Sequence, residues 1–216
     1  MKTVSNKAVL LMALFATSLG FAQSDAPDSR SEFKVGFKGG VSLSNIYDQE
    51  NQDYVADNKT GYFLGGFLSI PLGKYIGLQP EVLYSQKGFK GSGSVGGLGI
   101  SNYDFSRTSN FIDIPLQLQL KPIEYVTILA GPQFSYLVDT KNTFNGSSNT
   151  ITEDEINKDN YKKNIFGFVV GADINIEHFV ISGRAGWDVS KSDKNGDDTT
   201  PRYKNRVVQL GVGYTF

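Results

Sequence analysis

The chain has no cysteine and only one histidine, His178, among its 216 residues. The lack of cysteine excludes disulfide bonds, thiolate metal sites and cysteine nucleophiles. A single imidazole cannot build a multi-histidine metal centre. The 21 basic and 22 acidic side chains nearly balance, so no basic surface for nucleic acid is expected. We therefore expect a protein that is not an enzyme and that holds no cofactor, no metal and no nucleic acid.

Long apolar runs are also missing, except near the start of the chain. Lys2 and Lys7 precede an apolar run from Ala8 to Leu19, and small residues follow up to Ala22. This run is shorter than the roughly 20 residues that a membrane-spanning helix needs. The pattern predicts a cleaved secretory signal peptide over residues 1–22. A disordered polar segment is then expected over residues 23–32, and one domain over residues 33–216.

Apolar and polar residues alternate with a period of two throughout that domain, which is typical of strands. Eight segments carry the alternation: 33–46, 62–72, 76–87, 111–120, 125–138, 165–176, 179–190 and 206–216. They are longer than the average strand of 5–6 residues and match the 9–11 residues that cross a bilayer as a tilted strand.

The links between these segments alternate strictly between long and short. Long links are expected at 47–60, 88–110, 139–164 and 191–205, and tight ones at 73–75, 121–124 and 177–178. Outer-membrane barrels have short periplasmic turns and longer extracellular loops. The sequence therefore predicts an all-β protein, an eight-stranded antiparallel up-and-down transmembrane β-barrel with both termini on the periplasmic side.

Alternation alone would also fit a soluble ligand-binding barrel with its apolar face turned inward. Aromatic residues near both ends of the apolar faces favour the membrane instead, because such rings form belts at the two membrane–water interfaces. The candidate belt residues are Phe33, Tyr62, Tyr84, Tyr136, Phe166, Phe179, Trp187, Tyr214 and Phe216.

The opposite face of the strands is rich in glycine and carries balanced charge. An eight-stranded barrel is just wide enough for side chains to fill, and buried charges need partners. A lumen charge network is therefore expected from Lys34, Lys38, Glu81, Lys87, Asp113, Asp173, Arg184 and Asp188. Paired charges of this kind predict a largely filled lumen.

Several stretches resemble a known family. They are LQPEVLYSQKG from Leu78, IDIPL from Ile112, AGPQFS from Ala130 and FGFVVGA from Phe166. In this order and spacing they are similar to the porin-family or PorT-like outer-membrane β-barrel domain of Gram-negative bacteria. The resemblance implies a barrel in the outer membrane, in contact with lipid and lipopolysaccharide, and does not by itself imply a pore.

The end of the chain is similar to the C-terminal signature of such barrels. Residues 209–216 alternate up to a final ring, Phe216. The resemblance implies that Phe216 is an assembly signal, recognised by the barrel-assembly machinery.

Chemical sites are few. His178 lies in a predicted turn, away from the loops. The acidic and amide side chains of residues 193–198 do not have the spacing of an EF-hand, and residues 153–155 form a plain acidic run. We expect a monomer with a structural or interaction role through its surface loops, with an envelope protein as a possible partner. The alternative is a narrow passive channel for small solutes.

Overall fold

The computed structural model describes residues 29–47, 55–95, 101–145, 150–154, 163–190 and 204–216. The predicted signal peptide and residues 23–28 lie outside this part of the chain. Within it, no helix is long and apolar enough to cross a bilayer. The elements are η2 (Ser29–Ser31), β1 (Lys34–Tyr47), β2 (Val55–Pro71), β3 (Ile76–Val95), β4 (Ser101–Ile123), β5 (Val126–Asn145), β6 (Thr150–Asp154), β7 (Asn164–Ile176), β8 (Phe179–Asp188) and β9 (Lys204–Thr215).

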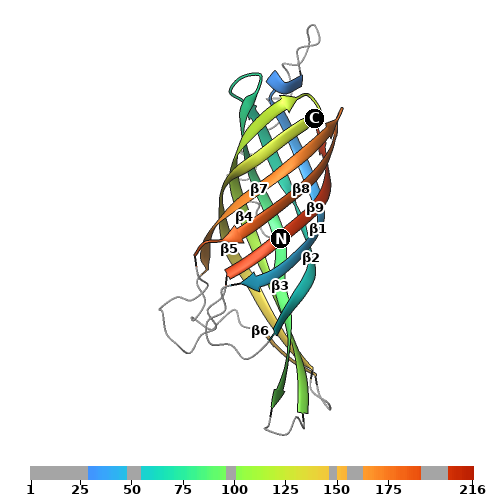
Figure 1. Cartoon of the computed structure of the whole chain (residues 1–216), viewed down its shortest axis with the longest axis vertical. Helices are drawn as coiled ribbons and strands as arrows, with labels where there is room; N and C mark the ends of the chain where they lie inside the picture. The colour runs from blue at the N-terminus through green and yellow to red at the C-terminus, as the bar shows by residue number, and fades with distance from the viewer. Residues whose placement is uncertain (1–28, 48–54, 96–100, 146–149, 155–162, 191–203) are drawn as a thin grey trace, which may run out of the picture.

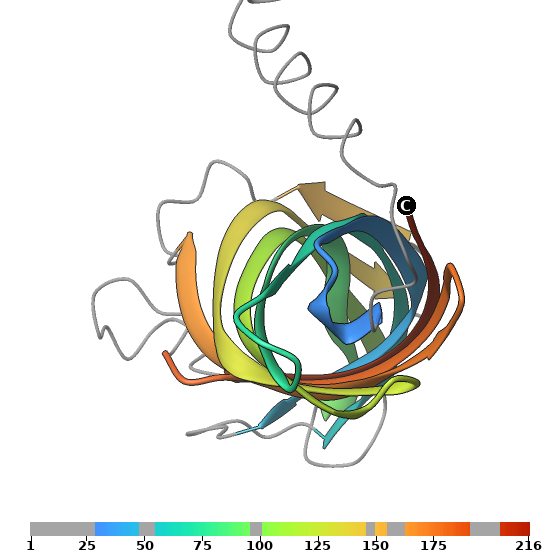
Figure 2. The same ribbon diagram turned by 90° about the horizontal axis from the view of Figure 1, so that it is seen from above.

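The strands form one antiparallel sheet that closes on itself (Figures 1 and 2). The order is β4-β3-β2-β1-β9-β8-β7-β5, and β4 also pairs with β5, which completes the ring. β1 and β9, which lie at opposite ends of the described sequence, pair from Gly36 with Thr215 to Tyr47 with Lys204. The short β6 pairs with β5 beyond the ring. The predicted eight-stranded up-and-down barrel is confirmed.

The apolar side chains face outward. On the adjacent strands β1 and β9, Val41, Leu210 and Val212 are each more than half exposed, at 56%, 62% and 67%. Their polar neighbours Lys38 and Ser42 are fully buried, at 0%. This is the arrangement of a barrel in lipid, with an apolar exterior and a polar interior. The alternative of a soluble barrel with an inward apolar face is therefore wrong.

One end of the barrel carries the tight links, and we call it the turn end. Here β7 joins β8 through Glu177 and His178, and Glu177 has a positive φ of 54°, a conformation that is uncommon for residues other than glycine. The opposite end, which carries the long links, is called the loop end. The chain leaves β9 at the turn end, beside β1.

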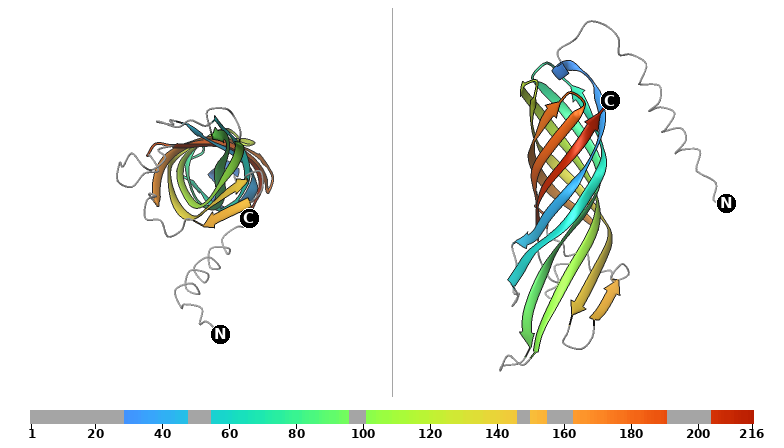
Figure 3. Two further views of the ribbon diagram at one scale, coloured as in Figure 1. Left: turned by 90° about the horizontal axis from the view of Figure 1, so that it is seen from below. Right: turned by 90° about the vertical axis from the view of Figure 1, so that its right-hand side faces the viewer.

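At the loop end the strands run further than the sequence predicted (Figure 3). β3 continues to Val95 and β4 begins at Ser101, so most of the expected loop 88–110 is a hairpin. β5 continues to Asn145, and β6 lies within the expected loop 139–164. The expected loop 47–60 overlaps β2, which begins at Val55. Beyond the membrane the outer face of the sheet meets water and can be polar, so backbone pairing continues without the apolar–polar alternation that the prediction used.

The other end of the chain also differs from expectation. Residues 29–31 belong to the segment predicted to be disordered, yet they form the 3₁₀ helix η2. Figure 2 shows this helix over the opening at the turn end of the barrel. Its contacts with the links there, described below, supply the order that its polar sequence does not suggest.

Candidate functional site

Three charged side chains from three strands meet inside the barrel. Lys38 of β1 places Nζ 2.6 Å from Glu81 Oε1, and Arg184 of β8 places Nη1 2.7 Å from Glu81 Oε2. All three residues are buried. We call Lys38, Glu81 and Arg184 the central cluster. One carboxylate from β3 thus holds two cations from strands with which β3 does not pair.

Glutamine side chains complete the central cluster. Gln79 and Gln117 donate from Nε2 to Glu81 Oε1 over 2.7 and 2.8 Å. Arg184 donates from Nε to Gln209 Oε1 over 2.6 Å. A buried charge is tolerated when it has hydrogen-bond partners, and both carboxylate oxygens of Glu81 accept hydrogen bonds. The cluster therefore fixes the relative positions of β1, β3, β4, β8 and β9.

The two cations of the central cluster also lie over aromatic rings. Lys38 Nζ is 5.2 Å from the centroid of Phe67, and the Arg184 guanidinium carbon is 4.8 Å from the centroid of Phe63. Both phenylalanines are buried on the inner face of β2. Cation–π contacts within about 6 Å are attractive, most of all when they are shielded from water.

A second group lies nearer the loop end, and we call Ser85, Lys87, Asp113 and Ser135 the loop-side cluster. Lys87 Nζ is 2.9 Å from Asp113 Oδ1, and Ser135 donates to the same oxygen over 2.5 Å. Ser85 donates to Asp113 Oδ2. Lys87 also lies 4.8 Å from the ring centroid of Phe111. The Lys87–Asp113 ion pair thus resembles the central cluster. In each, a carboxylate accepts hydrogen bonds from uncharged side chains, and the cation lies over an inward phenylalanine.

Of the other three charges expected in the lumen, Asp188 is buried and accepts two hydrogen bonds from Asn205. The backbone N–H of Asn205 is 3.2 Å from Asp188 Oδ2, and Nδ2 of Asn205 is 2.6 Å from it. Lys34 lies at the turn end, with Nζ 3.6 Å from Glu32.

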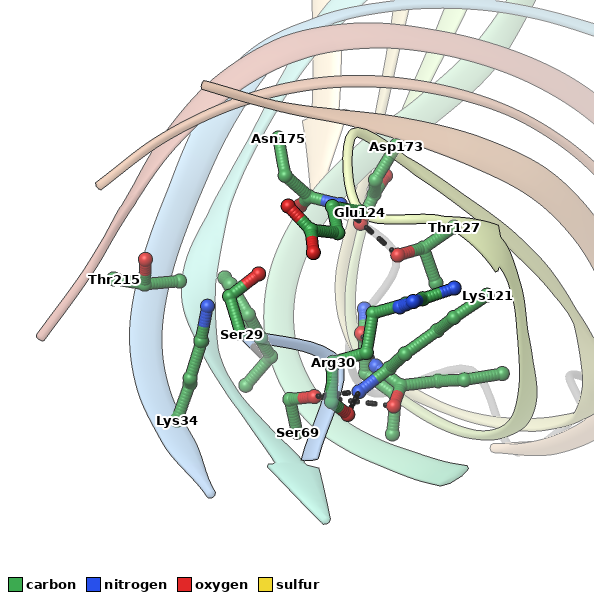
Figure 4. Close-up of a pocket in the computed structure, with 13 residues that line it drawn as sticks. Ser29, Arg30, Lys34, Ser69, Lys121, Glu124, Thr127, Asp173, Asn175 and Thr215 are labelled. Atoms are coloured by element: carbon green, nitrogen blue, oxygen red, sulfur yellow. Dashed lines mark hydrogen bonds between the residues drawn. The ribbon is translucent and has the colours of Figure 1, made fainter. Parts of the chain in front are cut away.

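Asp173, together with Lys34, lines a polar cavity of about 40 Å³ at the turn end (Figure 4). Within the described residues Asp173 Oδ1 is buried without a hydrogen-bond partner. Figure 4 shows Glu124, Thr127 and Asn175 around the same space. The eight predicted charges therefore divide between two ion-pair clusters, the Asp188–Asn205 pair and this cavity.

The candidate belt residues lie at the two ends of the outer face. Near the loop end, the rings of Tyr62 and Tyr84 are 6.1 Å apart. Near the turn end, Tyr214 contacts Phe179 and Phe216, at centroid distances of 5.5 and 5.4 Å. The exposed remaining members are Phe33, Tyr136, Phe166 and Trp187. Their role as membrane belts stays a prediction.

Reasoning from the sequence missed two kinds of residue. The inward phenylalanines Phe63, Phe67 and Phe111 were not singled out, because only aromatic residues on the apolar face were considered. The uncharged donors, such as Gln117 and Ser135, stand on the polar face of the alternation, but a pattern of charges alone does not single them out. Both kinds could have been found by reading every position of the inner face.

The described residues hold no group of three or more His, Cys, Asp or Glu side chains that could bind a metal ion. His178 is exposed in the β7–β8 link, where its Nδ1 lies 2.9 Å from the carbonyl oxygen of Thr215. Residues 193–198 lie outside the described part of the chain, as do the side chains of residues 153–155.

A closed antiparallel sheet with an apolar exterior and a polar interior defines a transmembrane β-barrel of the outer-membrane type. Comparison with family models agrees: residues 21–213 match the model described as outer membrane protein beta-barrel domain. The chain belongs to this family, and its location is the outer membrane. No curated protein matches the chain.

Solved structures of similar shape include three outer-membrane proteins. Ail, the attachment invasion locus protein of Yersinia pestis, solved with the heparin analogue sucrose octasulfate, is 17% identical with a TM-score of 0.47 and covers 86% of this chain and 99% of its own. OprG of Pseudomonas aeruginosa is 12% identical with a TM-score of 0.46, covering 88% and 99%. Neisserial surface protein A is 8% identical with a TM-score of 0.43, covering 85% and 97%. At these values the likeness says nothing about what this chain binds.

Proposed function

We propose that this protein is a non-conducting, non-enzymatic outer-membrane barrel that acts through the strands and loops at its loop end. The central cluster is the observation that supports a non-conducting barrel. Glu81 contacts Lys38 and Arg184 at once, and both cations are seated over inward phenylalanine rings. An eight-stranded barrel is barely wide enough for its own side chains, so a cluster of this size blocks a water path.

Opening such a path would require Glu81 to leave one of its two cations. A buried charge that loses its partner is destabilised by several kcal/mol. The loop-side cluster places a second ion pair, Lys87 with Asp113, in series with the first. Two closures in one narrow lumen support a filled barrel over the alternative of a narrow passive channel.

The extended hairpins support the second part of the proposal, that the protein acts through its loop end. β3 and β4 pair as far as Val95 with Ser101, and β5 pairs with β6. The membrane-spanning portion does not need this length, because 9–11 residues suffice to cross. We infer that the hairpins present a surface to an envelope or extracellular partner while the barrel, as a monomer, stays anchored among lipid and lipopolysaccharide.

Conductance measurements test the closed lumen. The purified protein is inserted into planar lipid bilayers, and the current is recorded for the wild type and for a paired opening variant, Glu81→Ala with Arg184→Ala. We expect no discrete current steps for the wild type and steps for the double variant. Steps of uniform size from the wild type would overturn the closed lumen and favour the narrow channel.

Shortening a hairpin tests the interaction role. Residues 92–104 are replaced by a two-residue turn, which leaves the barrel ring intact. Proteins crosslinked to the wild type on intact cells are compared with those crosslinked to the shortened variant by mass spectrometry. We expect a specific protein to disappear from the crosslinked set. An unchanged set, with folded barrel at wild-type level, would contradict a role for this hairpin.

A further inference from the structure

We propose that η2 is a releasable plug at the turn-end mouth and that a chain of hydrogen bonds joins it to the central cluster. This device is independent of whether the barrel conducts. It concerns access to the interior from the turn end and the way that access is linked to the ion pairs in the middle of the barrel.

Arg30 of η2 contacts the barrel at its turn end. Its carbonyl oxygen accepts a hydrogen bond from Lys121 Nζ over 3.0 Å. Its guanidinium donates from Nη1 to the carbonyl oxygen of Pro122 over 3.4 Å. The same guanidinium lies 5.1 Å from the ring centroid of Tyr75. Because Tyr75 lies in the β2–β3 link and Pro122 is the next-to-last residue of β4, these contacts hold η2 across the opening.

The cavity of about 40 Å³ lies directly behind this plug, and Ser29 and Arg30 are among its lining residues (Figure 4). Space of this size holds more than one water molecule, since one water needs about 10–15 Å³. Buried Asp173 faces the cavity with Oδ1 lacking a described hydrogen-bond partner. The space is therefore a polar vestibule, and η2 covers part of its mouth at the turn end.

A continuous chain of hydrogen bonds leads from the plug into the barrel. Lys121 Nζ, which holds the carbonyl of Arg30, also donates to Ser69 Oγ over 3.4 Å. Ser69 donates to Gln119 Oε1 over 3.1 Å, and Gln119 donates from Nε2 to Gln79 Oε1 over 2.5 Å.

The chain ends at the central cluster. Gln79 donates from Nε2 to Glu81 Oε1 over 2.7 Å, and Glu81 Oε2 accepts from Arg184. Each amide in the chain has one orientation that satisfies both of its neighbours, because its oxygen accepts and its nitrogen donates. Loss of the contact at Arg30 therefore frees Lys121 and removes the constraint on the amides behind it.

The plug can leave without disturbing the barrel. η2 has no buried residue, and it takes no part in the strand pairing. The contacts described for Arg30 are two hydrogen bonds between a cation and a carbonyl oxygen, one of them long, and one cation–π contact, and solvent weakens each of them. The central cluster, by contrast, is buried on all sides and remains when η2 is released.

Cysteine labelling tests the plug, because the chain contains no cysteine. Thr127, which is buried and lines the vestibule, is replaced by cysteine, and the rate of reaction with a small maleimide is measured on the protein in detergent. Arg30→Ala is then added, with Lys74→Ala as its matched control. Lys74 Nζ is the other cation over the Tyr75 ring, at 5.9 Å, and it lies outside η2.

Arg30→Ala removes both guanidinium contacts and keeps the backbone carbonyl that Lys121 holds. We expect it to raise the labelling rate by about tenfold and Lys74→Ala to leave the rate unchanged, because loss of such contacts shifts the open population by about that factor. Labelling is read on the band that migrates as folded barrel before heating, so unfolded molecules do not contribute. Equal rates in the two backgrounds would overturn the plug. So would a wild-type rate as fast as that of an exposed cysteine placed at Glu177.

A second pair of variants tests the link to the central cluster. Glu81→Gln alters the far end of the hydrogen-bond chain, and Asp113→Asn weakens the loop-side cluster, which lies outside that chain. We expect Glu81→Gln to raise labelling of the cysteine at position 127 by several-fold and Asp113→Asn to leave it unchanged. The same rate in both variants would overturn the link and restrict the device to the plug alone.

Discussion

Arg184 and Glu81 are 103 residues apart in the sequence, yet Arg184 Nη1 lies 2.7 Å from Glu81 Oε2 inside the barrel. The contact joins β8 to β3 across the interior, and Lys38 joins β1 to the same carboxylate. Hydrogen bonds along the wall connect each strand only with its neighbours. The central cluster therefore adds a brace between strands that do not pair.

The brace makes Glu81 the most sensitive position of the cluster. Glu81→Gln leaves two buried cations without a carboxylate, whereas Arg184→Met leaves Glu81 still paired with Lys38. Breaking a buried ion pair destabilises a protein by about 3–5 kcal/mol. We expect Glu81→Gln to reach that range and Arg184→Met to fall below it. The temperature at which the folded band converts on heat-modifiability gels measures both.

Glu124→Gln is the control, because Glu124 is exposed at the turn end and a surface change of this kind alters stability by about 0.5 kcal/mol or less. If Arg184→Met lowered the conversion temperature more than Glu81→Gln, the carboxylate would not be the centre of the cluster. If both variants converted at the wild-type temperature, so that their gel mobility after heating matched that of the wild type, the brace would be contradicted altogether.

The two ion-pair clusters are expected to contribute independently. Asp113 pairs with Leu83, two residues along β3 from Glu81, so Glu81 and Asp113 are diagonal neighbours about 7–8 Å apart. The described contacts of Glu81 and Asp113 have no partner in common. Changes at least about 7–10 Å apart that share no partner usually add within about 0.5 kcal/mol. We expect the losses from Glu81→Gln and Asp113→Asn to add in the double variant, as measured by urea unfolding in detergent. A clear departure from additivity would show that the lumen acts as one network.

Close contact between strands predicts opposite outcomes for two adjacent glycines. A Cβ added at Gly65 would lie 2.0 Å from the backbone oxygen of Val82, whereas one added at Gly66 would lie 3.5 Å from its nearest neighbour. Since a separation of 2.0 Å forces β2 and β3 apart, Gly65→Ala should lower the yield of heat-modifiable barrel. Gly66→Ala should fold like the wild type. Equal yields would contradict the tight inner packing of β2 against β3.

Charge on the outer face tests the orientation in the membrane. Leu116, seven residues from the turn-end terminus of β4, and Ile123, at that terminus, are exposed to nearly the same extent, at 50% and 53%. Arginine on the lipid face destabilises a barrel by about 2–4 kcal/mol at the midplane and about 0–1 kcal/mol near an interface. Leu116→Arg should therefore be far more damaging than Ile123→Arg in lipid vesicles. Equal effects would contradict a lipid-facing β4.

The predicted assembly signal is tested by comparing two rings of the turn end. Phe216 and Phe179 are both strongly exposed, and both contact Tyr214. If Phe216 is recognised during assembly, Phe216→Ala should lower the amount of folded protein in the outer-membrane fraction, while Phe179→Ala should not. Matched losses would indicate that these rings serve packing or lipid contact alone.

The fold could be predicted because lipid imposes a strict rule on each membrane strand. Positions such as Leu116 and Val212 must be apolar and their neighbours polar or small, so alternation marks the strands and their inner faces. The rule ends at the membrane surface, which is why the continuation of β3 to Val95 and the strand β6 were not predicted. Side-chain partners were also beyond the pattern, since nothing in one strand indicates which cation Glu81 will contact.

The pairing of β1 with β9 has a consequence for the order of events in biogenesis. Residues near position 36 pair with residues near position 215, so this edge of β1 stays unpaired until β9 has been synthesised and exported, whereas the other edge can pair with β2 early. Folding rates fall as contacting residues become more distant in sequence. Until the seam forms, the nascent chain carries two unsatisfied strand edges, which makes protection from aggregation a requirement during its passage to the membrane.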